Sequence, residues 1–101
     1  MDSYQSKKLD AIGDSTRRAI LERLLAGPMP VGKLAEKFPV SRPAISQHLR
    51  LLKEARLVVD TVAGTRRVYA LNPEGFDSLR AYFDQFWNQA LIAFKNKVEE
   101  Q

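Results

Sequence analysis

The chain of 101 residues contains no cysteine and only one histidine, and these shortages exclude several kinds of protein. Without cysteine there is no disulfide, no thiolate metal ligand and no cysteine nucleophile. His48 alone cannot supply a zinc site that needs several imidazoles from one chain. The sequence also lacks a glycine-rich phosphate loop and a cluster of carboxylates, so nothing in it predicts an enzyme. We expect neither a metal nor a cofactor.

Long apolar runs are missing as well. No stretch approaches the roughly 18 residues that a membrane-spanning helix needs, and the N-terminal MDSYQSKKLDAIGD has no apolar segment typical of a signal peptide. These absences predict a cytoplasmic protein without a membrane partner. The length suits one compact unit, so we expect residues 1–101 to form a single domain.

Positive charge is concentrated in the middle of the chain. The formal net charge is +4, and residues 31–56 alone carry six Lys or Arg against two Asp or Glu. The last segment, 74–101, carries three against five and is mildly acidic. A basic block of this kind favours an acidic partner such as nucleic acid.

Glycine and proline divide the chain into short helical and extended segments. Apolar residues at helical spacing predict helices, with Asp14 or Ser15 capping the second and Ser41 capping the fourth. Two β-branched runs, joined by Ala63-Gly64-Thr65, predict a hairpin. The fold class is therefore mainly α with a small β-hairpin wing, in the order α-α-α-α-β-β-α, over residues 4–12, 15–26, 31–38, 42–55, 57–62, 67–71 and 74–99.

The segments 31–38 and 42–55 are two short helices joined by a tight turn, which is the helix-turn-helix unit. At 100° per residue the second helix has an apolar side with Ile45, Leu49 and Leu52. The opposite side is polar and carries Ser46, Gln47, Arg50 and Glu54. Side chains of these types suit a duplex, since Gln pairs with adenine edges and Arg with guanine or phosphate. A merely solvated helix face is the alternative.

The hairpin adds a second basic feature. Arg66 and Arg67 follow its tip, and neighbouring strand residues point to opposite faces, so one can track a phosphate while the other braces the sheet. His48 falls beside the apolar side of its helix, next to Ile45 and Leu52. This position predicts a histidine at the boundary between core and surface that makes its hydrogen bonds within the protein. A contact with a DNA phosphate is the alternative.

Three stretches together resemble the ArsR/SmtB-type winged helix-turn-helix regulators: IGDSTRRAILERLL (12–25), LAEKFPVSRPAISQHLRLLKEARLV (34–58) and the wing from Gly64 to Leu71. That family consists of dimeric DNA-binding regulators, usually repressors. The resemblance implies DNA contacts from one set of residues in the fourth helix and the wing. These are Ser41, Arg42, Pro43, Ala44, Ser46, Gln47, His48, Arg50, Arg66 and Arg67.

The chain departs from the family in three ways. Pro39 stands in the turn where members often have glycine, and Arg56 stands where glycine often ends the recognition helix. Metal-sensing members carry cysteine pairs, or histidine and carboxylates on the last helix, whereas this chain has no cysteine and no histidine there. It therefore resembles the branch that does not sense metals, and the sequence points to no effector.

The 74–99 segment predicts a dimer. Its apolar residues form a helical stripe that a chain of this size cannot bury fully. Because burial stabilises each large apolar side chain by about 1.5–3 kcal/mol, we expect a second subunit to cover the stripe. A core helix of one domain is the alternative, and a membrane-lying helix fits poorly because the segment is acidic. The resemblance implies an interface between first and last helices, with Tyr4, Leu9, Ile12, Phe83, Phe86, Trp87, Ala90, Leu91 and Phe94.

Together these features predict a sequence-specific regulator of transcription that binds double-stranded DNA as a homodimer on an inverted repeat, with repression the expected outcome. The alternative is a winged-helix module that binds a protein partner without reading DNA. Gln47, Arg50, Arg66 and Arg67 distinguish the two, because only the first function needs them.

Overall fold

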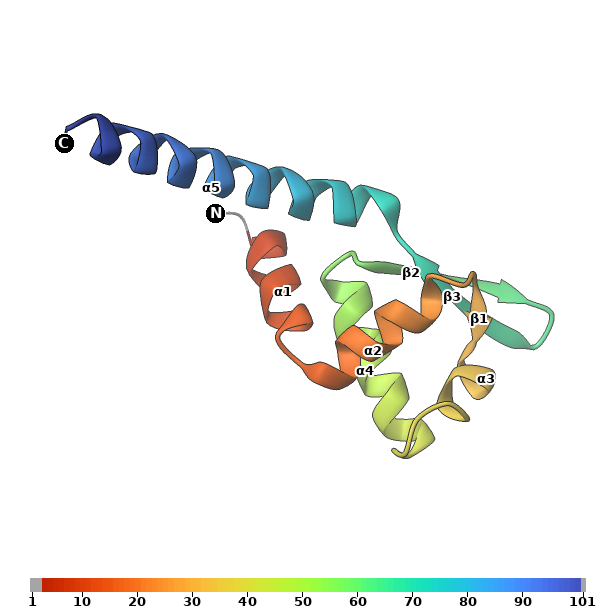
Figure 1. Ribbon diagram of the computed structural model, residues 1–101. Coiled ribbons are helices and arrows are strands. Elements are labelled where there is room, and N and C mark those ends of the chain that lie inside the picture. Colours follow the sequence, from red (N-terminus) through yellow and green to blue (C-terminus); the bar gives the residue numbers. More distant parts are fainter. Residues whose placement is uncertain (1–2, 101) are drawn as a thin grey trace.

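The computed structural model describes residues 3–100 and contains the expected helices and hairpin (Figure 1). The shorter helices pack together beside a small sheet whose hairpin projects from one end of the body, and a long final helix leaves the body of the molecule. The elements are α1 (Ser3–Ile12), α2 (Ser15–Leu24), β1 (Met29–Pro30), α3 (Val31–Ala35), α4 (Arg42–Glu54), β2 (Val58–Ala63), β3 (Arg66–Leu71) and α5 (Pro73–Glu99).

The sheet has one strand more than the sequence predicted. Its order is β1-β3-β2, all antiparallel, and Met29 and Asp60 lie on either side of Tyr69 in β3. The two-residue β1 has no recognisable period, and Pro30 suits its place at the sheet edge because it lacks a backbone donor. Ala63 pairs with Arg66, so the hairpin turn is Gly64-Thr65, with Gly64 at φ +66°.

Helix α3 is shorter than the predicted 31–38. The apolar stripe of that segment continues to Phe38, which packs against the core, but residues 36–40 form turns and bends. The N–H groups of Lys37 and Phe38 donate to carbonyls three positions earlier, and Pro39 then prevents any return to helix because it disfavours helical backbone in Phe38. Similarly α2 ends at Leu24, and Gly27, with φ +128°, turns the chain toward β1.

Helix α4 runs through the centre of the body. Ile45, Leu49 and Leu52 are completely buried, together with Ile20 of α2 and Leu34 of α3. This is the apolar side predicted for the fourth helix, and its burial fixes which side faces outward.

Helix α5 meets the body only at its beginning. Gly75 and Leu79 are its buried residues, and the rest of the helix projects away (Figure 1). The molecule is consequently elongated, with extents of 64 × 25 × 24 Å. Within residues 3–100, no helix has both the length and the apolar character required to cross a bilayer.

Candidate nucleic-acid interface

The start of α4 is a well-formed helix N-terminus. Ser41 is the N-cap, and its Oγ accepts a hydrogen bond of 3.3 Å from the backbone N–H of Ala44. Pro43 sits in the first turn, where a missing N–H costs nothing. Ser41, Arg42 and Pro43 are exposed and Ala44 is half-buried, so the leading end of the helix presents small and polar groups outward.

The end of α4 accommodates Arg56 in place of glycine. Arg56 adopts φ +62°, in the left-handed region that favours glycine, while its N–H donates to Lys53 O and that of Leu57 donates to Leu52 O. These two bonds form a Schellman motif, which ends the helix at the expected place. The Arg56 guanidinium lies 3.8 Å from the ring centroid of Tyr4 and donates to its hydroxyl at 2.8 Å.

The outward side of α4 carries an ordered row of polar groups. Arg50 donates to Gln47 Oε1 at 3.2 Å and to Glu54 Oε1 at 2.9 Å. Ser46, Gln47, Arg50 and Glu54 are all exposed. The row therefore lies opposite the buried side of the helix, with the Arg50 and Gln47 side chains held together on the surface.

In the wing, the two arginines differ in their surroundings. Arg67 forms an ion pair with Asp60, which also accepts from Lys53 Nζ of α4 at 2.8 Å. The Asp60 side chain is only 6% exposed. The hydrogen bond from Lys53, followed by that from Arg67, lowers the pKa of the Asp60 carboxyl below its ordinary value. Arg67 thus braces the sheet against α4, whereas Arg66 has no ion-pair partner within residues 3–100.

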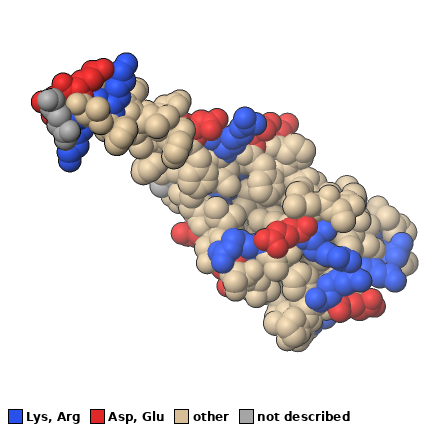
Figure 2. All heavy atoms as spheres, viewed as in Figure 1, with Lys and Arg blue, Asp and Glu red and all other residues tan. Residues whose placement is uncertain are grey.

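A groove of about 480 Å³ separates the wing from the helix-turn-helix. Four of its lining residues are cationic, namely Lys33, Arg42, Arg66 and Arg67. Figure 2 shows Lys and Arg side chains gathered over this end of the body and an uncharged surface along the middle of α5. Lys33 was not among the predicted contact residues, although its position in the basic block could have indicated it.

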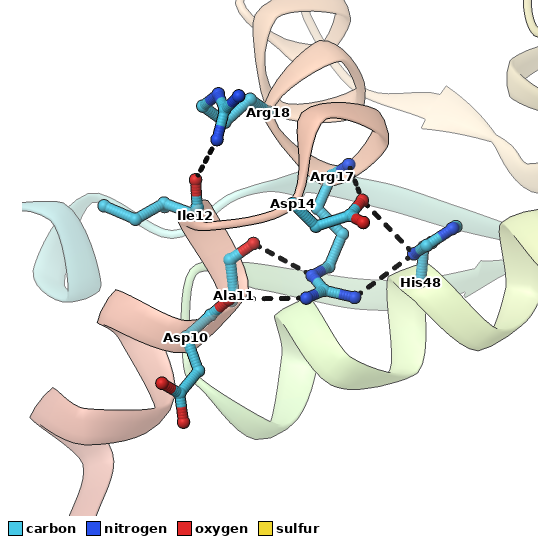
Figure 3. A network of polar contacts seen from close by, with 7 residues as sticks. All are labelled: Asp10, Ala11, Ile12, Asp14, Arg17, Arg18 and His48. Carbon is cyan, nitrogen blue, oxygen red and sulfur yellow. Dashed lines mark hydrogen bonds and ion pairs between the residues drawn. The ribbon is translucent and has the colours of Figure 1, made fainter.

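His48 lies inside a polar network between α2 and α4 (Figure 3). Its Nδ1 is 3.3 Å from Arg17 Nη1 and 3.9 Å from Asp14 Oδ2, and the side chain is 22% exposed. Asp14 is the N-cap of α2 and accepts from the Arg17 N–H at 2.9 Å. That hydrogen bond is the main reason why the pKa of Asp14 is lowered. The structure thus gives His48 partners within the protein.

The residues proposed for the dimer interface divide into two groups. Leu9 and Ile12 are half-buried, and Ile12 packs against the core. By contrast, the apolar side chains along α5 are largely exposed, and Phe86, Trp87 and Phe94 are 64–68% exposed. The same exposed stripe includes Phe83, Ala90 and Leu91, and Tyr4 is exposed near its start.

Residues 3–100 contain no group of three or more His, Asp or Glu side chains arranged to hold a metal ion.

Comparison with known proteins identifies the family. Residues 14–59 match the model of the bacterial regulatory protein family arsR. The HTH-type transcriptional regulator Rv2034 of Mycobacterium tuberculosis is 52% identical over 103 residues, covering 100% of this chain and 96% of the relative. The chain belongs to the ArsR family of bacterial regulatory proteins. The resemblance inferred from the sequence is confirmed, and the protein is a transcriptional regulator with a winged helix-turn-helix, not an enzyme.

Two other similar proteins are informative. The transcriptional repressor SdpR of Bacillus subtilis is 47% identical over 62 residues, which is 61% of this chain and 69% of the repressor. The solution structure of a homodimeric winged helix-turn-helix DNA-binding domain, Mb0332 of Mycobacterium bovis, has a TM-score of 0.69 and 24% identity. The alignment covers 85% of this chain and 80% of that domain, and it confirms the predicted fold class.

Proposed function

We propose that this ArsR-family protein binds duplex DNA sequence-specifically as a homodimer on an inverted repeat and represses transcription. The observation that carries the proposal is the exposed polar row on α4, which lies opposite a fully buried apolar side. A major groove about 12 Å wide admits such a helix. The cationic groove beside the row suits the phosphates that flank the bases.

Each residue of the interface has a role that its position supports. Gln47 and Arg50 face outward in the middle of α4 and would meet base edges. Arg66 would contact a phosphate from the wing, while Arg67 supports the wing through Asp60. The leading end of the helix would contact the DNA backbone or bases through Ser41, Arg42, Pro43, Ala44 and Ser46, and His48 would reach the backbone from the α2 side.

The dimer rests on the exposed apolar side of α5. Phe86, Trp87 and Phe94 are large side chains in one uncharged stretch, and contiguous apolar patches of this kind mark interfaces. We therefore assign α1 and α5 as dimerisation helices of a single domain spanning residues 1–101. A two-fold axis would place the two copies of α4 about 34 Å apart, which is one turn of DNA, so the target is an inverted repeat.

The homodimeric state of Mb0332 and the repressor activity named for SdpR agree with these assignments. A dimer seated on its operator would exclude other proteins from the same stretch of DNA, which supports repression as the outcome. We infer a cytoplasmic location from the proposed DNA target. The absence of cysteine argues against a thiolate-bound metal as effector.

Arg50→Ala tests the DNA interface. We expect it to weaken binding to a selected duplex by about 1–3 kcal/mol, because Arg50 would make one of the base contacts. Stability should change by only about 0.5 kcal/mol, since the Arg50–Glu54 pair is exposed. Fluorescence anisotropy and thermal melting measure the two quantities.

Arg80→Ala is the matched control. Arg80 also pairs with an acidic residue four positions later, Asp84, but on α5. It should leave DNA affinity unchanged. Equal affinities of the Arg50→Ala variant and the wild type would favour the protein-interaction module instead.

A further inference from the structure

Arg17 is the centre of the network in Figure 3 and connects three helices. Its side chain extends from α2 to the last turn of α1, where Nε donates to Ala11 O at 2.9 Å and Nη2 donates to Asp10 O at 3.3 Å. The remaining nitrogen, Nη1, lies 3.3 Å from Nδ1 of His48 in α4. The two carbonyl bonds fix the plane of the guanidinium and therefore the direction of its third donor.

The partner of His48 decides where the imidazole carries its proton. A guanidinium only donates hydrogen bonds, so the Nδ1 that faces Arg17 must accept. Asp14 Oδ2, at 3.9 Å from Nδ1, is beyond hydrogen-bond distance and already accepts from the Arg17 N–H. A neutral imidazole that accepts at Nδ1 carries its proton on Nε2. Figure 3 shows this second ring nitrogen pointing away from both Asp14 and Arg17.

We propose that Arg17 is a positioning residue for DNA recognition, which holds the neutral His48 ring so that Nε2–H donates to a phosphate oxygen of the duplex. The proposal rests on the DNA-binding function proposed above. His48 is a half-buried residue of α4, and its side chain is exposed enough, at 22%, to make one contact while Arg17 holds the other side of the ring. Arg17 itself would act only through His48.

The single histidine makes the first arm of the test direct, because every imidazole signal comes from His48. Two-bond nitrogen–proton NMR spectra of histidine-labelled protein without DNA, recorded at mildly alkaline pH, report the tautomer. We expect Nε2–H in the wild type and a mixture of tautomers in the Arg17→Met variant. An Nδ1–H ring in the wild type, or an unchanged ring in Arg17→Met, would overturn the proposal.

Arg18→Met is the matched control. Arg18 also donates to a carbonyl at the end of α1, Ile12 O at 2.6 Å, but does not contact His48. This variant should keep the wild-type tautomer. It therefore separates the contact with His48 from the general loss of an arginine that ties α1 to α2.

The second arm measures DNA affinity for Arg17→Met, His48→Ala and the double variant on one selected duplex. We expect each single variant to bind roughly five- to tenfold more weakly, and the double variant to be no weaker than His48→Ala. Additive losses would show that Arg17 acts independently and would contradict the proposal. Thermal melting checks that each variant is folded at the assay temperature.

The two arms separate this proposal from the function on which it rests. Failure of the wild type to bind any duplex would refute the DNA-binding function, whatever the tautomer. Normal binding by the wild type with an unchanged affinity in Arg17→Met would refute only the role of Arg17. The tautomer of the wild type remains decisive even where Arg17→Met does not fold.

Discussion

At the scale of single residues, Asp60 links the recognition helix to the wing. Its side chain is only 6% exposed, although the residue as a whole is half-buried, and it accepts hydrogen bonds from Lys53 of α4 and Arg67 of β3. The two cations lower its pKa, so the folded protein binds a proton at this site less readily than the unfolded chain. Its stabilising contribution is present above the unfolded pKa of about 3.8 and is lost as the pH falls through the lower folded value.

Asp60→Asn should therefore lower the free energy of unfolding by about 1 kcal/mol at neutral pH, a modest figure because both cations are half exposed. The difference from the wild type should shrink as the pH falls below 3.8. Urea denaturation at several pH values measures it. Asp84→Asn, in an exposed pair on α5, should have almost no effect. A difference that does not change with pH would show that the ion pairs are not its source.

The sequence predicted the positions of single residues well where these positions follow from the geometry of one helix. The apolar and polar sides of α4 follow from 100° per residue alone, and Ser41 is a cap as predicted. Of the two predicted candidates for the cap of α2, Asp14 and Ser15, the structure has Asp14. The Asp60 cluster could not be predicted, because it depends on the register of β2 against β3 and on α4 crossing them. Likewise Arg56 was recognised as unusual, but not its stacking on Tyr4, which lies 52 positions earlier.

At the scale of elements, Gly75 allows α5 to start close to the end of α4. A Cβ added at Gly75 would lie 1.8 Å from the carbonyl oxygen of Arg56. Asn72 reinforces this contact, since its side chain donates to the same oxygen and its backbone N–H donates to Leu57 O. The direction in which α5 leaves the body is therefore set by a backbone contact that no larger residue permits.

Gly75→Ala should destabilise the protein by about 1–3 kcal/mol, because the obstacle is backbone and the start of α5 must shift. Gly32→Ala in α3 is the control, since its new Cβ would have neighbours no closer than 3.9 Å. That control should be neutral or stabilising, as alanine favours helix. Chemical denaturation compares the two. A Gly75→Ala variant as stable as Gly32→Ala would contradict the close contact.

Elements with a clear period were predicted to within a few residues, and those without one were not. The long stripe of α5 and the two β-branched runs of the hairpin specified their elements. In contrast, β1 was not predicted, because its two residues form a strand only by pairing with β3. The predicted end of α3 was too late, because the apolar stripe continues after the backbone has left the helix. Gly75 was not singled out, since a glycine needed for a distant contact has no local signature.

At the scale of the whole molecule, the proposed dimer depends on α5. The predicted stripe is exposed along most of the helix, as a partner would require. Phe86→Asp would place a charge in the middle of that stripe, and we expect it to convert a dimer into a monomer of 11.5 kDa. Analytical ultracentrifugation at micromolar concentration distinguishes the two masses.

Gln85→Glu adds one negative charge one position away and is the control. At 100° per residue, Gln85 lies on the other side of α5 from the stripe, so this variant should stay dimeric. A monomeric wild type would refute the proposed dimer. Dissociation of both variants would assign the effect to charge on α5 in general, not to the stripe.

Selection of bound duplexes from a random DNA pool by the full chain tests the proposed DNA-binding function most directly. We expect an enriched inverted repeat whose half-sites are centred about 10 base pairs apart, because two copies of α4 would enter successive major grooves on one face of the duplex. Absence of any enriched sequence, or enrichment of a single half-site without its inverted copy, would contradict it.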